Sequence, residues 1–132
     1  MKQNRSPNPS RRQVVTSLVV IALVPSLRLR AAQNIPMTVW TGPGCSCCHD
    51  WVAYLKSNGF AVTTHDGGNM DARSRLGMPM QYGSCHTGEV VGYAIEGHVP
   101  ATEIHRLIEE RPNAIGLSVP AMPRGSPGMD GP

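Results

Sequence analysis

The sequence predicts an α/β domain in which a small mixed sheet is flanked by helices. Two patterns lead to this prediction. The first is a strand–helix–strand unit over residues 35–65, which favours two parallel strands joined by a right-handed crossover. The second is an alternating segment at residues 89–95 followed by an amphipathic helical pattern from Pro100. An apolar leader precedes this domain, and a tail rich in proline, glycine and methionine follows it.

The strand–helix–strand unit is defined by residue type and spacing. Ile35–Trp40 contains β-branched and aromatic residues and predicts a strand, after which Thr41–Gly44 predicts a turn. A helix over about residues 45–57 is indicated by four apolar residues at helical spacing, namely Cys48, Trp51, Val52 and Leu55. Asn58-Gly59 ends this helix, because glycine accepts a left-handed backbone conformation, and Phe60–His65 predicts the second strand.

The middle of the chain carries weaker signals. Met70–Leu76 predicts a short helix that Gly77 stops. Glu89–Ile95 alternates between apolar and polar residues and predicts a strand, whose partner lies just before Cys85 or just after Gly92.

The last helix and the tail differ sharply in composition. Pro100 suits the first turn of a helix that ends near Arg111 and whose buried face is formed by Ala101, Ile104, Leu107 and Ile108. No regular element fits residues 112–132, which contain five prolines and four glycines. This segment is either an irregular tail or an extended arm laid back on the domain, with Met122 and Met129 as anchors or ligands. The predicted organisation is an export signal over 1–32, the domain over 33–111 and this extension over 112–132.

The first 32 residues have the features of an export signal. Arg11-Arg12 precedes an apolar run over Val14–Leu27, an order typical of the twin-arginine route. The run is shorter than the roughly 20 residues of a spanning helix, so we expect cleavage and no stable membrane insertion. The rest of the chain has six basic and nine acidic residues, a net charge of −3, and no basic patch for nucleic acid. We therefore predict a periplasmic protein that does not bind nucleic acid.

The cysteines carry most of the chemical signal. Three of the four lie within four positions, as Cys45, Cys47 and Cys48, and the fourth, Cys85, adjoins His86. Thiols at this density indicate a soft metal, a reactive disulfide or both. Cys45 and Cys48 form a Cys-x-x-Cys pair at a helix start, where the helix dipole favours the thiolate. With the predicted order of strands and helices, this pair indicates a thioredoxin-like domain whose candidate catalytic residues are Cys45 and Cys48.

Three stretches resemble the CopG family of small periplasmic copper-resistance proteins: GCSCCHDW, SCHTGEVVGYAIEGHVPATEIHRLIEERP and GLSVPAMPRGSPGM. The resemblance covers about residues 38–130, and its motifs rarely coincide. It implies a thioredoxin-like domain with a metal-binding C-terminal extension, a cysteine-bridged copper cluster and an oxidoreductase role between Cu(I) and Cu(II). By motif, the implied copper ligands are Cys45, Cys47, Cys48 and Cys85. Family members often have glycine where Ser46 stands, a change that an exposed helix turn tolerates.

The residue types favour copper over zinc. Cu(I) is soft and prefers thiolate and thioether ligands, and one thiolate can bridge two ions, so the site has room for one ion or several. Zinc would fit four cysteines, or three cysteines and a histidine, but zinc sites usually space their ligands more openly than Cys47-Cys48. His86 is a further candidate ligand because it adjoins Cys85, and Met122 and Met129 are candidates through the tail. His49 and His98 are weaker candidates.

The place of Cys85 decides whether the four cysteines share one site. They do so if the strand that faces the redox helix begins after Cys85, which leaves residues 84–87 as a loop at the metal end, and we expect this arrangement. In an oxidised sample, two possible disulfides are Cys48–Cys85 and Cys47–Cys85.

The sequence therefore predicts an exported copper-binding protein of copper resistance that interconverts Cu(I) and Cu(II), with an efflux system or an electron donor as its partner. Three other functions stay open. The chain would be a copper chaperone or storage module if it binds copper without turnover, and a thiol–disulfide oxidoreductase if it is active without metal. A structural zinc domain is the third.

Overall fold

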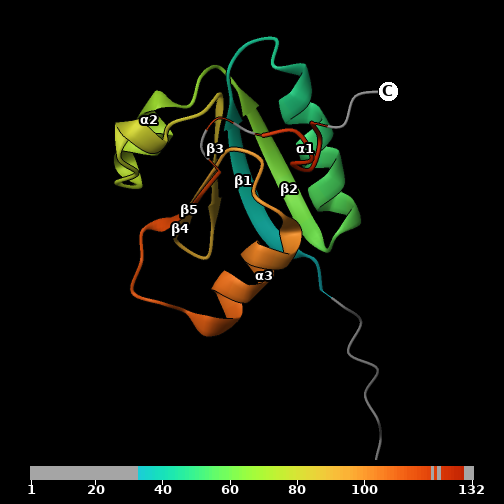
Figure 1. The fold of residues 1–132 in the computed structure, drawn as a ribbon, viewed down its shortest axis with the longest axis vertical. Coiled ribbons are helices and arrows are strands. Elements are labelled where there is room, and N and C mark those ends of the chain that lie inside the picture. The colour runs from blue at the N-terminus through green and yellow to red at the C-terminus, as the bar shows by residue number, and fades with distance from the viewer. Residues whose placement is uncertain (1–32, 120, 122, 130–132) are drawn as a thin grey trace, which may run out of the picture.

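A five-stranded mixed sheet forms the centre of the molecule in the computed structural model, which describes residues 33–119, 121 and 123–129 (Figure 1). The strand order is β2-β1-β3-β4-β5. The β1·β2 and β4·β5 pairs are parallel, and β1·β3 and β3·β4 are antiparallel. The predicted export signal and Met122 lie outside the described residues. This architecture confirms the predicted α/β fold with a mixed sheet.

The predicted strand–helix–strand unit is present almost residue for residue. It consists of β1 (Ile35–Thr41), α1 (Ser46–Ser57) and β2 (Phe60–Asp66). The strands pair from Ile35↔Phe60 to Thr41↔Asp66. The residues of α1 that are buried are the four of the predicted stripe, Cys48, Trp51, Val52 and Leu55. This face packs into the main core and orients the start of α1 toward the end of β1.

The prediction of one strand over Glu89–Ile95 is wrong, because a hairpin occupies this region. Strand β3 (His86–Val90) turns back into β4 (Tyr93–Glu96) through Val91 and Gly92, which have φ angles of 50° and 84°. Positive φ at both central residues fits a two-residue hairpin turn of type I′, but valine seldom adopts a positive φ, so residue type concealed the turn.

The start of β3 confirms the predicted placement of Cys85. Strand β3 begins at His86, which pairs with Thr41 at the end of β1. Cys85 therefore lies directly before the strand, at the same end of the sheet as the start of α1. The expected loop over residues 84–87 is shorter than predicted, since His86 and Thr87 already belong to β3.

The helices cover both faces of the sheet (Figure 1). Helices α1 and α3 (Ala101–Glu110) share the main core with alternate strand residues such as Val39 and Ile95. The opposite face carries Trp40 and Glu96, and α2 (Met70–Arg75) meets both through arginine side chains. A 3-10 turn, η1 (Met80–Tyr82), follows α2. None of the helices in the described part of the chain has the length and apolarity needed to span a bilayer.

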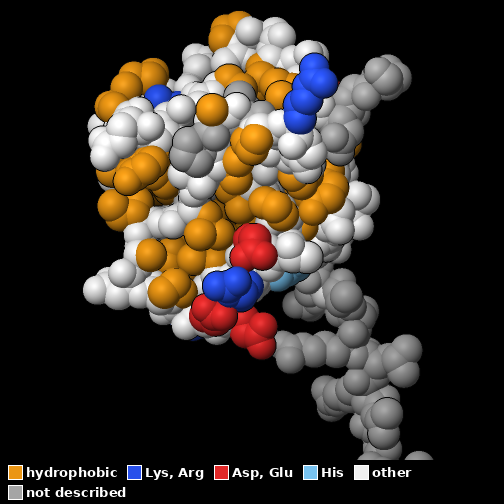
Figure 2. Space-filling view, in the orientation of Figure 1, with side chains coloured by type: hydrophobic (Ala, Val, Ile, Leu, Met, Phe, Trp, Pro, Cys, Tyr) orange, Lys and Arg blue, Asp and Glu red, His pale blue; other side chains and the backbone are white. Residues whose placement is uncertain are grey.

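Charged side chains on the viewed surface gather mainly over α3 (Figure 2). There Arg106 contacts Glu103 at 3.2 Å and Glu110 at 3.1 Å. All three side chains are about half exposed or more. These are surface ion pairs within one helix, and they take no part in placing the cysteines.

The described part of the C-terminal extension contains one regular element that the sequence did not predict. Strand β5 (Gly116–Ser118) pairs in parallel with β4, although residues 112–132 were expected to lack regular structure. Gly116 permits this pairing, because a Cβ atom there would lie 1.7 Å from the carbonyl oxygen of Ala94. Farther on, Gly128 packs so closely on α1 that a Cβ would lie 2.7 Å from the backbone nitrogen of Trp51. The described part of the extension is therefore an arm packed on the domain.

Candidate metal centre

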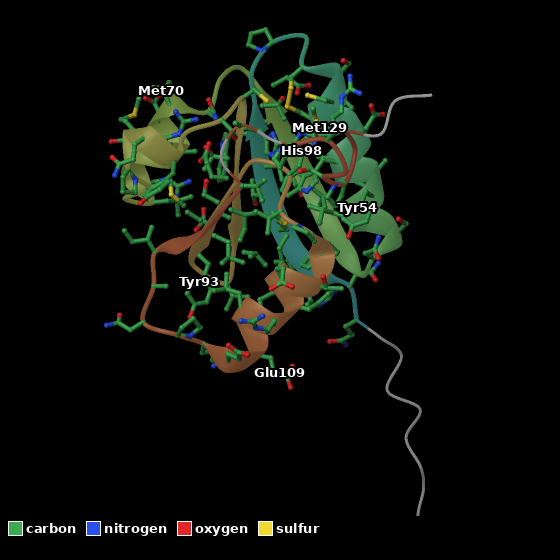
Figure 3. The ribbon with its side chains drawn as sticks, viewed as in Figure 1. Tyr54, Met70, Tyr93, His98, Glu109 and Met129 are labelled. Atoms are coloured by element: carbon green, nitrogen blue, oxygen red, sulfur yellow. A yellow bond between two sulfur atoms is a disulfide. The ribbon has the colours of Figure 1, made fainter. Side chains whose placement is uncertain are left out.

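Four sulfur atoms converge where α1 and β3 begin. Cys45 is the N-cap residue of α1, Cys47 and Cys48 lie in its first turn, and Cys85 directly precedes β3. The four Sγ atoms all lie within 4.8 Å of one another. Figure 3 shows sulfur atoms gathered at this end of α1. Cys48 is fully buried and the other three cysteines are partly buried, so the cluster is open to solvent on one side.

Cys45 and Cys48 form a disulfide, whereas Cys47 and Cys85 are free thiols. The disulfides Cys48–Cys85 and Cys47–Cys85, which the sequence left open, are absent. The bonded residues are three apart in one helical turn, with Cα atoms 5.4 Å apart, a separation that suits a disulfide. The Sγ of Cys85 lies 3.4 Å from the Sγ of Cys45 and 3.4 Å from that of Cys48, and the Sγ of Cys47 lies 3.6 Å from that of Cys45.

His86 adds a nitrogen ligand to the sulfur cluster. Its side chain is fully buried, and its Nδ1 lies 3.3 Å from the Sγ of Cys48 and 3.7 Å from that of Cys85. Its Nε2–H donates to the carbonyl oxygen of Gly97 at 2.9 Å, which leaves the lone pair of Nδ1 facing the sulfurs. Burial is the main cause that lowers the pKa of His86 to about 4; the hydrogen bond to Gly97 opposes this shift, and the nearby His98 and Arg73 add to it. The imidazole is therefore neutral at physiological pH, the form that binds metals.

Cys85 is held as a protonated thiol without metal. Burial raises the pKa of the Cys85 thiol, and the neighbouring Cys47 raises it further. A thiophilic ion would have to displace this proton, so its binding is linked to pH.

Two solved structures of similar fold are named Copper resistance protein copG, Form 1 and Form 2. Both are 47% identical in sequence to this chain. Form 1 aligns over 74% of this chain and 78% of its own with a TM-score of 0.68, and Form 2 over 75% and 80% with a TM-score of 0.69. The chain belongs to the CopG family of copper resistance proteins. A family model described as a protein of unknown function, DUF411, matches residues 82–129. A search of curated protein sequences found no significant match.

A buried carboxylate braces the loop that carries Cys85 in this CopG-family chain. Glu96 is fully buried, and its Oε1 accepts hydrogen bonds from Arg73 Nη2 at 2.8 Å, from Ser84 N–H at 2.8 Å and from the Ser84 hydroxyl at 3.0 Å. Its Oε2 accepts one from the Thr87 hydroxyl at 2.8 Å. Donors on both sides of Cys85 are thus tied to one carboxylate at the end of β4.

Residue-by-residue inspection of the sequence missed this brace. Glu96 has no second acidic residue near it in sequence, and Arg73 lies 23 positions away. The only available signal was its place in Glu96-Gly97-His98, where the backbone of the middle residue also orients His86.

The other candidate ligands have different surroundings. His98 is fully buried, donates from Nδ1 to the carbonyl oxygen of Pro127 at 2.7 Å, and has its ring centre 5.1 Å from that of His86. Its Nε2 has no hydrogen-bond partner among the described residues. His49 is exposed. Met129 lies on the arm beside α1, near His98 (Figure 3), and its N–H donates to the carbonyl oxygen of Ser126 at 2.9 Å. A ligand role for Met129 or Met122 stays a prediction.

Proposed function

We propose that this chain binds copper in the periplasm as part of copper resistance, and that the bound copper changes between Cu(I) and Cu(II). The proposed ligands are the Nδ1 of His86 and the thiolates of Cys45, Cys47, Cys48 and Cys85. The observation that carries the proposal is the convergence of four Sγ atoms within 4.8 Å from two segments about 40 residues apart.

The donor set suits a soft ion. With Cys45 and Cys48 reduced, the site offers four sulfurs and one neutral imidazole nitrogen, a set that Cu(I) prefers to oxygen ligands. A thiolate sulfur can bridge two ions, so the four thiolates and the imidazole nitrogen can hold more than one copper per site. The names of the two CopG structures support copper as the cargo.

The site is also preorganised to receive the ion. His86 is already neutral, and the Gly97 carbonyl already holds the ring with Nδ1 toward the sulfurs. Glu96 already holds the Cys85 loop in place. Binding therefore orders few side chains, which reduces its entropic cost. It must, however, remove the proton from Cys85.

A second candidate function, thiol–disulfide exchange without metal, is favoured by one observation. The disulfide joins the N-cap residue of α1 to a residue of its first turn, where a helix dipole stabilises the thiolate that forms when the bond breaks. This function predicts that metal-free protein reduces or oxidises a dithiol substrate and that Cys45→Ser abolishes this activity.

Metal loading of the reduced chain separates these functions. The chain is reduced under nitrogen, offered Cu(I) or Zn(II) at equal concentration in separate samples, desalted and analysed for metal. We expect retained copper at more than one ion per chain. His86→Asn should lower the affinity for Cu(I) at least tenfold, and His49→Asn, which changes an exposed histidine next to the same motif, should leave it unchanged. Retention of one zinc and no copper would contradict the proposal.

A further inference from the structure

We propose that Cys45 and Cys48 are the electron donors of this site: their oxidation to the disulfide reduces two Cu(II) ions to Cu(I). The inference rests on the proposed function, because it takes copper as the substrate. It adds the source of the electrons, the number transferred in each turnover and the class of partner that restores the site.

The geometry shows the product side of such a reaction. The Cys45–Cys48 bond coexists with free thiols at Cys47 and Cys85, although the Sγ of Cys85 lies 3.4 Å from each bonded sulfur. Of several sulfurs at contact distance, this pair is the one that is bonded. Its members are three residues apart at the start of α1, with Cα atoms 5.4 Å apart, a separation at which a disulfide closes without backbone movement.

The electron and proton balance of the step is complete. The Cys45 and Cys48 thiols lose two protons and two electrons as one S–S bond forms between them. Two Cu(II) ions each accept one electron and become two Cu(I) ions, and the protons pass to solvent. The step needs no dioxygen and no cofactor, because the dithiol is the reductant and Cu(II) is the oxidant.

The ligands that remain after oxidation select the reduced ion. Cys47 and Cys85 keep their sulfurs free, and the Nδ1 of His86 lies 3.7 Å from the Sγ of Cys85. Two thiols and a neutral imidazole form a soft set that holds Cu(I) better than Cu(II). Stabilising the product favours reduction, and a site with fewer thiolates gives up copper more readily than the fully reduced site.

Restoring the site requires a dithiol reductant, and burial shows where it attacks. Cys48 is fully buried, whereas Cys45 is partly exposed. The thiolate of the partner therefore attacks the Sγ of Cys45, and Cys48 leaves as a thiolate beside His86. The second thiol of the partner then resolves the mixed disulfide and carries away the two electrons. Without such a partner the reaction stops after one turnover.

The test is an anaerobic titration of the reduced chain with Cu(II) sulfate. Cu(I) is counted with a chromophoric Cu(I) chelator, thiols are counted after unfolding in excess chelator, and the disulfide is located by peptide mass spectrometry. We expect two Cu(I) per chain, a fall from four thiols to two, and a Cys45–Cys48 bond. Four remaining thiols, or a disulfide that includes Cys47 or Cys85, would overturn the inference.

Paired variants assign the electrons to individual residues. Cys45→Ser/Cys48→Ser should slow Cu(I) formation at least tenfold. Cys47→Ser/Cys85→Ser should still convert its two thiols to a disulfide but should lose at least tenfold in Cu(I) affinity. Met80→Leu, which changes an exposed thioether outside the cluster, should match the parent chain. Equal rates of Cu(I) formation in the two double variants would refute the assignment. If a variant does not fold, the thiol count of the parent chain after the titration still tests the inference.

Direct loading with Cu(I) separates this inference from the proposed function. A reduced chain that binds Cu(I) but does not reduce Cu(II) refutes the dithiol as electron donor and leaves copper binding intact. A reduced chain that binds no Cu(I) refutes the proposed function and this inference together.

Discussion

Replacing Glu96 with glutamine should strongly destabilise the chain and disturb the cysteine site. The side chains of Arg73 and Glu96 are 5% and 0% exposed, so their ion pair is buried. Glu96→Gln keeps the shape and one acceptor oxygen but leaves the guanidinium of Arg73 without a counter-ion. It also places an amide against one of the donors of Ser84 or Thr87.

The magnitude follows from this burial. Removing one partner of a buried ion pair costs about 3–5 kcal/mol, because the remaining charge is desolvated and unpaired. Because the glutamine still accepts some of the hydrogen bonds, we expect the lower end, about 3 kcal/mol. Arg73→Met/Glu96→Gln removes both charges and should be less destabilised than the sum of its single variants, by at least about 1 kcal/mol.

The assay is urea unfolding of the metal-free, disulfide-bonded chain. The control is Glu110→Gln, which breaks an exposed pair with Arg106 on α3 and should change the free energy of unfolding by about 0.5 kcal/mol or less. Since Glu96 holds both sides of the Cys85 loop, Glu96→Gln should also lower copper affinity, and Glu110→Gln should not. A loss of less than 1 kcal/mol for Glu96→Gln would show that the brace is unimportant.

Three further predictions concern His86 and the C-terminal arm. The pKa of His86 is about 4 in the folded chain and about 6.5 when unfolded, so the unfolded state gains the proton first as pH falls. The free energy of unfolding, measured with urea, should therefore decrease by about 1.5 kcal/mol between pH 6.5 and pH 5. His86→Asn should make the free energy of unfolding less dependent on pH in this range. Gly128→Ala should loosen the arm, because the added Cβ would collide with the backbone of Trp51. The control Gly125→Ala is also at positive φ but faces open space, so it should cost only the backbone strain. Limited proteolysis would detect the difference between the two variants. Truncation after Ala121 should weaken copper retention or change the absorption spectrum of the loaded protein, and an unchanged stoichiometry and spectrum would leave the arm without a metal role.

Local patterns predicted the elements whose signals lie within a single segment. The stripe on α1 is visible at a spacing of three and four residues, and the parallel pair β1·β2 follows from the right-handed crossover. The β3–β4 hairpin was hidden, because Val91 adopts a positive φ that its side chain disfavours. Strand β5 was hidden as well, since three residues carry no periodic signal and the strand exists only through its pairing with Ala94–Glu96.

The site shows the same division. The clustering of Cys45, Cys47 and Cys48 is visible within four positions of the sequence, and the expectation of soft-metal chemistry followed from it. The place of Cys85 depended on where β3 begins, and the strand begins directly after Cys85, as expected. The bonded pair has the Cys-x-x-Cys spacing, but only the tertiary structure brings the Sγ of Cys85 to 3.4 Å from both of its sulfurs.

The amino-acid sequence by itself determined which atoms this protein can offer to a metal, because thiols, imidazoles and helix starts are properties of residues and their neighbours. Tertiary structure alone decided how these atoms are used. Burial makes His86 neutral, the Gly97 carbonyl turns its Nδ1 toward the sulfurs, and Glu96 anchors the loop of Cys85 from the far end of β4. Desolvation and hydrogen-bond direction depend on what surrounds a group in space, and those neighbours come from distant parts of the chain.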